Sequence, residues 1–245
     1  TFNLMCGMSV PAENFPFCTI DPSVSRVRVP DDRFDRLCQM YSPASEKPAH
    51  LKVTDIAGLV KGAAEGAGLG NAFLSHIRST DAIYQVVRCF EDDEVVHVED
   101  SVDPVRDLQI IADELRVKDL EWVEKEHKRL EHVVARVDKT KKKQLETVTR
   151  LFEWLKAGHH ARHGEWSADD IEVLNEMMLL TSKPTIYLVN LSARDFQRKK
   201  NKWLPKLAAW VKEHGGEPVI PFSVAFEQEL VDAGSPEARA AIEEE

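Results

Sequence analysis

The chain has 245 residues, of which 43% are hydrophobic, and it carries a formal net charge of −10. This length fits one large domain or two small ones, and the apolar content is sufficient for a sizeable core. The acidic balance argues against a general nucleic-acid or membrane-surface binder, so we expect neither DNA nor a membrane as a partner. No apolar run approaches the ~20 residues that cross a bilayer.

The cysteines and the two ends of the sequence indicate where such a protein belongs. No secretory signal-peptide pattern opens the chain. The four cysteines lie far apart, without the paired spacing of metal ligands: Cys6, Cys18, Cys38 and Cys89. We therefore expect reduced thiols in a cytoplasmic protein. Both ends of the sequence have a helical pattern ("TFNLMCGM" and "PEARAAIEEE"), so we interpret the chain as a piece of a longer protein.

Short apolar runs separated by loops predict the strands of a sheet. The predicted strands are "HLKVTDIAG" (50–58), "DAIYQVVRCF" (81–90), "TIYLVNLS" (185–192) and "EPVIPFS" (217–223). A helix is expected at 70–79, and another at 198–216, where Pro205 indicates a break or a helix start. Near-continuous apolar strands that alternate with helices predict a mostly parallel α/β sheet.

A charged, helix-rich segment interrupts this alternation at residues 104–180. Apolar positions repeat there at spacings of three and four in two stripes: Val123, His127, Leu130, Val134 and Val137, then Leu145, Val148, Phe152 and Leu155. Two such stripes joined by "DKTKKK" (138–143) predict an antiparallel helical hairpin inserted into the α/β domain. We expect the stripes to form the hairpin core.

Glycine is concentrated at one strand-to-helix crossing. Five of the eleven glycines lie in "DIAGLVKGAAEGAGLGNAFLSHI" (55–77). In phosphate-binding α/β folds ligands lie beyond the carboxyl ends of the strands, where Asp55 could hold Mg²⁺. The absence of a Cβ at Gly58 would let a main-chain N–H approach a terminal phosphate. Taken alone, "DxxG" fits a structural linker equally well.

The order of the predicted loops favours a nucleotide site over a structural linker. "NFPFCTIDP" (14–22) precedes the glycine cluster, while "LVNLS" (188–192) and "PFSVA" (221–225) follow later strands. This order matches switch I, switch II and the two base-recognition loops of a GTPase-type domain. Together with "RCFEDDEVVHVE", "SVDPVRD", "LTSKP" and "RKKNKWL", these motifs resemble the Obg-like ATPases, the YchF-type branch of the Obg-related P-loop GTPases, over essentially the whole chain.

The resemblance implies a fold and a domain order. Family members have a P-loop G domain, a helical coiled-coil insert and a C-terminal TGS domain. On this basis residues 1–103 and 181–230 form the two parts of the G domain. Residues 104–180 form the insert, and residues 231–245 lead towards a TGS domain. The sequence contains no G-x-x-x-x-G-K-[ST], the loop that grips the β- and γ-phosphates, so residues 1–245 alone are expected to be inactive.

The resemblance also assigns residues to the phosphate end of the site. Asp55 corresponds to the switch II acid and Thr19 to the switch I threonine, so both are expected to bind Mg²⁺. The alternatives are a helix N-cap for Asp55 and a turn hydroxyl for Thr19. Leu59 stands where Ras-like GTPases carry a water-orienting glutamine, and leucine cannot orient water. His97 matches a histidine implicated in hydrolysis, and its alternative is a surface histidine on an acidic loop.

The base end of the site is expected at the last two predicted strands. Asn190 should hydrogen-bond the base, and Ser223 closes the base pocket in the family. Leu191 and Phe90 could cover the flat ring, although either is more often core. Ala193 stands where guanine-selective proteins carry aspartate and where the family usually carries glutamate.

Taken together, the sequence predicts an ATP-hydrolysing, Mg²⁺-dependent protein that binds GTP more weakly and associates with ribosomes. Two alternatives stay open, namely a nucleotide-switched adaptor with incidental hydrolysis and a degenerate scaffold that binds no nucleotide. The "DKTKKK" lysines could touch ribosomal RNA phosphates, although such a run is more often a solvated turn.

Overall fold

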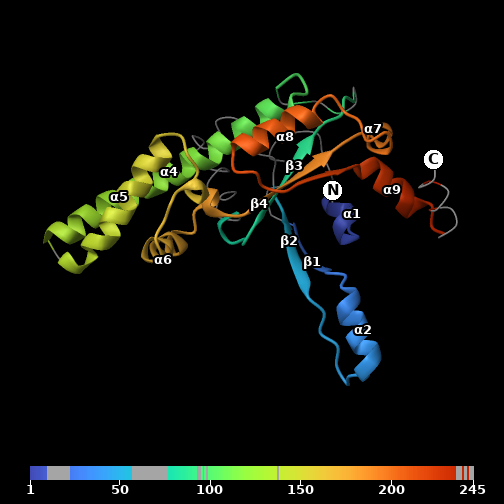
Figure 1. The fold of residues 1–245 in the computed structure, drawn as a ribbon, viewed down its shortest axis with the longest axis horizontal. Helices are drawn as coiled ribbons and strands as arrows, with labels where there is room; N and C mark the ends of the chain where they lie inside the picture. Colours follow the sequence, from blue (N-terminus) through green and yellow to red (C-terminus); the bar gives the residue numbers. More distant parts are fainter. Residues whose placement is uncertain are drawn as a thin grey trace. The chain divides into compact units, whose positions relative to one another are not determined.

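The computed structural model describes residues 1–9, 23–56, 77–92, 95, 97, 99–136, 138–235, 239 and 242 (Figure 1). The chain divides into two compact units, Thr1–Ala57 and Gly58–Glu245. No helix within these described ranges is long and apolar enough to cross a membrane. The predicted domain boundaries stay predictions.

The first unit is built on an antiparallel strand pair. Its elements are α1 (Phe2–Cys6), β1 (Ser23–Arg28), α2 (Asp32–Tyr41) and β2 (His50–Asp55). Strands β1 and β2 pair so that Ser23 lies opposite Asp55. Helix α2 begins after Asp31, whose carboxylate accepts a hydrogen bond from the Arg33 N–H at 2.9 Å. The predicted strand at 50–58 is found as β2, which ends at Asp55. Its expected place in the parallel sheet is wrong, because β2 pairs antiparallel with β1 in a separate sheet.

The second unit contains the predicted parallel sheet. Its strands are β3 (Ile83–Arg88), β4 (Thr185–Asn190) and β5 (Val219–Phe222), and they lie in the order β3-β4-β5. Both pairings are parallel, and at the carboxyl edge Arg88, Asn190 and Phe222 stand side by side. Three predicted strands are thereby confirmed, and their order brings the loops after β3, β4 and β5 to one edge.

Helices account for most of the second unit. They are α4 (Pro104–Arg136), α5 (Lys142–Lys156), α6 (Ala168–Met177), α7 (Ala193–Gln197), α8 (Leu204–Glu213) and α9 (Val224–Asp232), with short 3-10 turns η1 (Lys139–Lys141), η2 (Ala161–His163) and η3 (Leu180–Ser182). Pro205 lies in the first turn of α8, where no main-chain N–H is needed. Of its two predicted roles, the structure selects the helix start.

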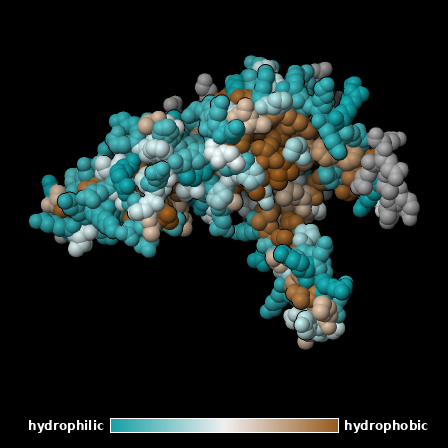
Figure 2. Space-filling view, viewed as in Figure 1, coloured by the Kyte–Doolittle hydropathy of each residue, from teal (hydrophilic) through white to brown (hydrophobic). Residues whose placement is uncertain are grey.

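One face of the parallel sheet forms the main core. Alternate residues of β4 point into it, with Tyr187 and Val189 buried. Helices α4 and α8 cover this face with Leu108, Leu207 and Trp210. The other face carries exposed apolar side chains at Tyr84, Val86 and Ile220, and Figure 2 shows apolar residues gathered over β3 and β4.

Helices α4 and α5 form the predicted antiparallel hairpin (Figure 1). Val123, Leu130, Val148 and Leu155 of the predicted stripes are fully buried between them. Its tip contains neither glycine nor proline. Asp138 instead caps η1, since its carboxylate accepts hydrogen bonds from the N–H and the hydroxyl of Thr140 at 2.8 and 2.6 Å. An Asx-type turn therefore reverses the chain.

Candidate functional site

The carboxyl edge of β3, β4 and β5 is the candidate site. Cys89 N–H donates to the carbonyl oxygen of Asn190 at 2.9 Å, and Leu191 N–H donates to that of Phe222 at 2.8 Å. These bonds extend the sheet pairing one residue beyond the strands. Three predicted base-end residues, Asn190, Leu191 and Ser223, therefore lie at one edge, the place where open α/β sheets bind ligands.

Asn190 uses one half of its amide to hold the protein together. Its Oδ1 accepts a hydrogen bond from the main-chain N–H of Val224 at 3.0 Å. Because that partner can only donate, the bond fixes which side of the amide is oxygen. No described residue accepts a hydrogen bond from Nδ2. The half-buried side chain therefore retains two N–H donors for a ligand, which suit an acceptor such as N7 of a purine.

Leu191 and Ser223 have structural roles at this edge. Leu191 is 2% exposed and belongs to the core beneath the sheet. Ser223 is fully buried, and its hydroxyl accepts the Phe226 N–H at 3.3 Å as the N-cap of α9. The core alternative therefore describes the Leu191 side chain in this structure. A contact between Ser223 and a ligand would have to come from its main chain.

The loop after β3 is organised by Arg88, a residue that no sequence motif marked as functional. The Arg88 guanidinium donates to the carbonyl oxygens of Phe90, Asp92 and Val95 at 3.1, 3.3 and 2.9 Å. It also lies 4.9 Å from the centroid of the Phe90 ring. Phe90 is half-buried, and Arg88 stacks on one side of its ring.

Asn201 is a second residue that sequence reasoning missed, although it lies within the quoted "RKKNKWL". Its Nδ2 donates to the carbonyl oxygen of Cys89 at 3.0 Å and to the Asp195 carboxylate at 2.7 Å. Its Oδ1 accepts the Trp203 N–H at 2.8 Å. One amide therefore connects the loops after β3 and β4, so both loops are fixed relative to each other.

His97 lies in the segment between β3 and α4, and it contacts the helical insert. Its Nε2 is 2.9 Å from Oδ2 of Asp107, in the first turn of α4, and its Nδ1 accepts the Glu99 N–H at 3.1 Å. The Asp107 carboxylate was not identified from the sequence, although it ends the quoted "SVDPVRD".

Burial, and then the charge of Asp107, raise the pKa of the Cys89 thiol to about 12, so this thiol stays protonated.

Of the residues predicted to bind phosphate or Mg²⁺, the structure describes only Asp55, which belongs to the first unit. Asp55 is half-buried at the end of β2, and burial raises its pKa. Thr19, Gly58 and Leu59 lie outside the described residues. Within the described ranges no group of three or more His, Cys, Asp or Glu side chains could hold a metal. A single carboxylate fits Mg²⁺, which in nucleotide sites is bound by one or two carboxylates together with phosphates and water.

Three of the four cysteines lie within the described residues. Cys6, Cys38 and Cys89 are free thiols. Cys18 lies outside the described residues.

A comparison with models of protein families gives a match. A model of the family described as "50S ribosome-binding GTPase" matches residues 1–136, which is more than half of the chain. This match covers the first unit, the β3 strand and all of α4.

Curated relatives match nearly the whole chain. Obg-like ATPase 1 of Oryza sativa subsp. indica is 57% identical over 238 residues, which cover 97% of this chain and 60% of the relative. Obg-like ATPase 1 of Caenorhabditis elegans is 51% identical over 246 residues, which cover 100% of this chain and 62% of the relative. The chain therefore spans about 60% of the length of these relatives.

A solved structure agrees with the sequence matches. The Schizosaccharomyces pombe YchF GTPase is 48% identical and superposes with a TM-score of 0.80, covering 99% of this chain and 66% of that one. The expected fold class, a P-loop NTPase α/β domain with an inserted helical hairpin, is confirmed by this neighbour. The chain belongs to the 50S ribosome-binding GTPase family, on its Obg-like ATPase (YchF-type) branch.

Proposed function

We propose that this chain is the nucleotide-binding part of a cytoplasmic, ribosome-associated protein that binds and hydrolyses ATP with Mg²⁺. The observation that carries nucleotide binding is the hydrogen bonding of the Asn190 amide. Its oxygen is engaged by Val224, and its amide nitrogen has no partner within the described ranges at the carboxyl edge of the sheet. A purine N7 is an acceptor of the right kind for that nitrogen.

The preference for ATP follows from the residues after Asn190. Guanine offers N1–H and N2 donors, which guanine-selective proteins satisfy with an aspartate at the position of Ala193. Alanine leaves those donors unpaired on burial, at a cost of roughly 1–3 kcal/mol for an unsatisfied group. Adenine has no N1–H and no 2-amino group. The preference is modest because the glutamate that the family usually carries is also absent, so GTP still binds.

Hydrolysis is assigned to His97, because Leu59 offers no polar atom to a water molecule. Gly58 N–H would contact the terminal phosphate, and Asp55 and Thr19 would hold Mg²⁺. When bound, the cation neutralises charge that develops on the transferred phosphoryl group. The histidine then has the task of orienting the attacking water.

Binding to phosphates also needs the glycine–lysine loop that residues 1–245 lack. Charge-assisted hydrogen bonds of that loop contribute roughly 1.5–3 kcal/mol each. We therefore expect residues 1–245 alone to bind ATP far more weakly than the full-length gene product. Micromolar binding by residues 1–245, measured calorimetrically, would contradict this expectation.

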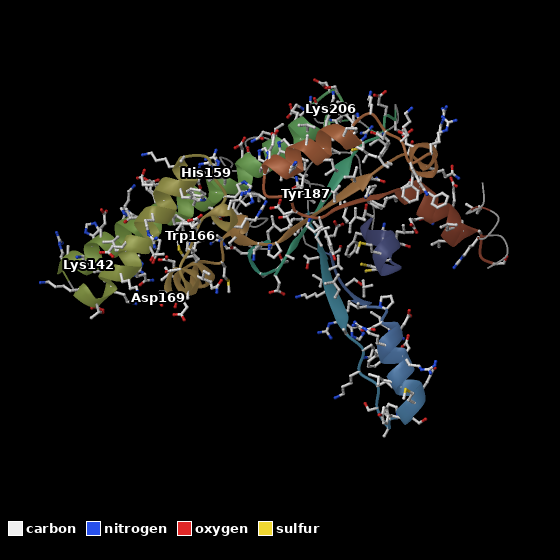
Figure 3. All side chains as sticks on the ribbon, viewed as in Figure 1. Lys142, His159, Trp166, Asp169, Tyr187 and Lys206 are labelled. Atoms are coloured by element: carbon white, nitrogen blue, oxygen red, sulfur yellow. The ribbon has the colours of Figure 1, made fainter. Side chains whose placement is uncertain are left out.

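The helical hairpin favours a second candidate, a nucleotide-switched adaptor with incidental hydrolysis. Figure 3 shows Lys142 at the tip of the hairpin, far along it from Tyr187 of the sheet. At this tip Lys143 pairs with Asp169, whereas Lys139 and Lys141 form no ion pair with any described side chain. Exposed lysines at the end of a projecting hairpin suit ribosomal RNA phosphates, and equally suit a solvated turn.

One experiment separates these functions. ATP binding and turnover are measured on the full-length protein, with and without ribosomes, for wild type, His97→Ala and Leu59→Ala. We expect His97→Ala to lower turnover with little change in affinity and Leu59→Ala to leave slow turnover largely intact. Equal turnover in wild type and the His97 variant would remove the histidine from the mechanism. Ribosome binding that follows nucleotide state but not turnover would favour the adaptor.

A further inference from the structure

We infer that Asp107 is a positioning residue for His97, one that fixes its tautomer and leaves the Nδ1 lone pair as the acceptor for water. The inference rests on the role in hydrolysis proposed above for His97. It assigns a task in turnover to the first turn of the helical insert.

Two independent partners specify the same tautomer of His97. The Asp107 carboxylate, 2.9 Å from Nε2, can only accept, so the proton lies on Nε2. The Glu99 main-chain N–H, 3.1 Å from Nδ1, can only donate, so Nδ1 carries the lone pair. The His97 and Asp107 side chains are only 16% and 23% exposed, which limits the competition from water for this pair.

Asp107 is itself held in place by its neighbour. The Arg106 Nε and Nη2 atoms donate to Oδ1 of Asp107 at 3.2 and 3.1 Å, which leaves Oδ2 for His97. Arg106 also donates to the hydroxyl and carbonyl oxygens of Ser101, at 3.0 and 2.6 Å. The carboxylate that orients the histidine is therefore itself oriented before any ligand binds.

The anchor is a helix rather than a loop. Asp103 directly precedes helix α4, and its Oδ1 accepts the N–H groups of Val105 and Arg106 at 3.1 Å each. Its 33 residues continue into the hairpin. Side chains on capped helices hold their geometry better than side chains on loops, which is what a histidine that must aim one nitrogen requires.

The two nitrogens of His97 differ in how readily they can change partner. The Nδ1 partner is a single neutral N–H, which the O–H of a water can replace while the Nε2–H bond to Asp107 is kept. A water held by Nδ1 is oriented with its oxygen lone pairs free for phosphorus. The Asp107 carboxylate also makes the imidazole a better acceptor.

The test is Asp107→Asn in the full-length protein. The Arg106 donors would hold the amide oxygen and turn the NH₂ group towards His97 Nε2. That donor forces the imidazole proton onto Nδ1, where it meets the Glu99 N–H. We expect kcat for ATP to fall roughly 10- to 100-fold while the nucleotide Kd stays within about twofold. The ¹⁵N chemical shifts of the His97 ring should change from those of the Nε2–H tautomer to those of the Nδ1–H tautomer.

Two further variants distinguish positioning from general damage. Asp113→Asn, in the same helix, removes an exposed carboxylate bonded to Gln109 and Arg116, and it should leave kcat unchanged. In a His97→Ala background, Asp107→Asn should cause no further loss, because its effect passes through the histidine.

Each outcome decides between the two proposals. If His97→Ala keeps full turnover, the hydrolytic role of the histidine fails. If His97→Ala is impaired but Asp107→Asn turns over like wild type, only the positioning inference fails. A further loss of kcat in the double variant would also overturn it. The wild-type protein gives a test without any variant, since an Nδ1–H tautomer in its NMR spectrum would refute the inference.

Discussion

Asn190 Oδ1 accepts a hydrogen bond from the main-chain N–H of Val224 at 3.0 Å, so a side chain at the end of β4 fixes the turn after β5. The sequence predicted that Asn190 hydrogen-bonds the base. The structure commits the oxygen to the protein and leaves the nitrogen. Adenine and guanine share the N7 acceptor, so Asn190 supports purine binding without choosing between them.

The first prediction separates the two halves of that amide. Asn190→Asp keeps an acceptor for the Val224 N–H but replaces the donor with a second acceptor. We expect the melting temperature of the full-length protein to change little. Affinity for ATP and GTP should fall alike, by roughly tenfold, since one bonding group is lost and lone pairs face N7. Calorimetric titration with both nucleotides measures this.

Asn190→Ala is the matched control, because it removes both halves. It should lower the melting temperature as well as both affinities. A loss of ATP affinity with unchanged GTP affinity in Asn190→Asp would contradict a contact with an atom common to both bases.

The second prediction concerns base choice at Ala193. This residue begins α7 after the Ser192 cap, where an acidic side chain is favourable to the helix. Ala193→Asp would offer acceptors to guanine N1–H and N2. We expect the ratio of GTP to ATP affinity to rise roughly 5- to 150-fold, the equivalent of 1–3 kcal/mol. Ala193→Ser, without a carboxylate, should leave the ratio near wild type, and an unchanged ratio in Ala193→Asp would remove this position from the base pocket.

Strands with strong apolar runs were predictable because their signal is local. Strands β2 and β4 start where the sequence predicted and end at Asp55 and Asn190, two to three residues before the ends of the predicted ranges. Pro205 marked the start of α8 because proline fits a first helical turn and no later one. The hairpin stripes were readable for the same reason, since a helix repeats its buried face every three or four residues.

Strand β1 gave no such signal. Its residues "SVSRVR" place valine at 24 and 27, which breaks the alternation of a half-buried strand. The strand exists because it pairs with β2 along its whole length. Tertiary pairing of this kind overrides weak local propensity.

The supporting residues of the site were missed because their partners are distant in the chain. The Asn201 side chain hydrogen-bonds Cys89, which is 112 positions away in the sequence, and neither residue stands out among its sequence neighbours. Asp107 is ten residues from His97, but the contact depends on the fold of the intervening loop. A single sequence carries no record of such pairs. Nothing in the local text therefore marked Arg88, Asn201 or Asp107.

The third prediction tests how the hairpin is joined to the sheet. Asp119 of α4 is fully buried, and its carboxylate accepts three hydrogen bonds, from the Leu180 N–H at 2.9 Å and from the Thr181 N–H and hydroxyl at 2.7 Å each. Asp119→Ala leaves three buried donors unpaired. We expect the free energy of unfolding, measured in urea, to fall by about 3 kcal/mol or more.

Glu121→Ala is the control for Asp119→Ala. Glu121 lies two residues away on α4, is 43% exposed and pairs with Lys118 at 3.0 Å. Its loss should change stability by no more than about 0.5 kcal/mol. Asp119→Asn, which keeps one acceptor oxygen, should lie between the two. Equal stability of Asp119→Ala and Glu121→Ala would show that the buried carboxylate does not join α4 to η3.

The last prediction concerns a histidine held neutral. His160 is bonded through Nε2 to the carbonyl oxygen of Ala112 at 3.0 Å, and its buried Nδ1 has no partner within the described ranges. Burial, and then the positive charge of Arg162, lower the pKa of His160 from 6.5 to about 4. The unfolded chain therefore binds more protons than the folded chain between these two values.

Because protonation favours the unfolded chain, His160 contributes stability that is fully present above pH 6.5 and is lost as the pH falls towards about 4. The shift corresponds to at most about 3.5 kcal/mol. His160→Gln keeps an N–H donor for Ala112 but cannot titrate. Its free energy of unfolding should therefore depend less on pH than that of wild type, with the difference between the two confined to this window. Parallel pH curves for wild type and His160→Gln would show that His160 ionises alike in both states.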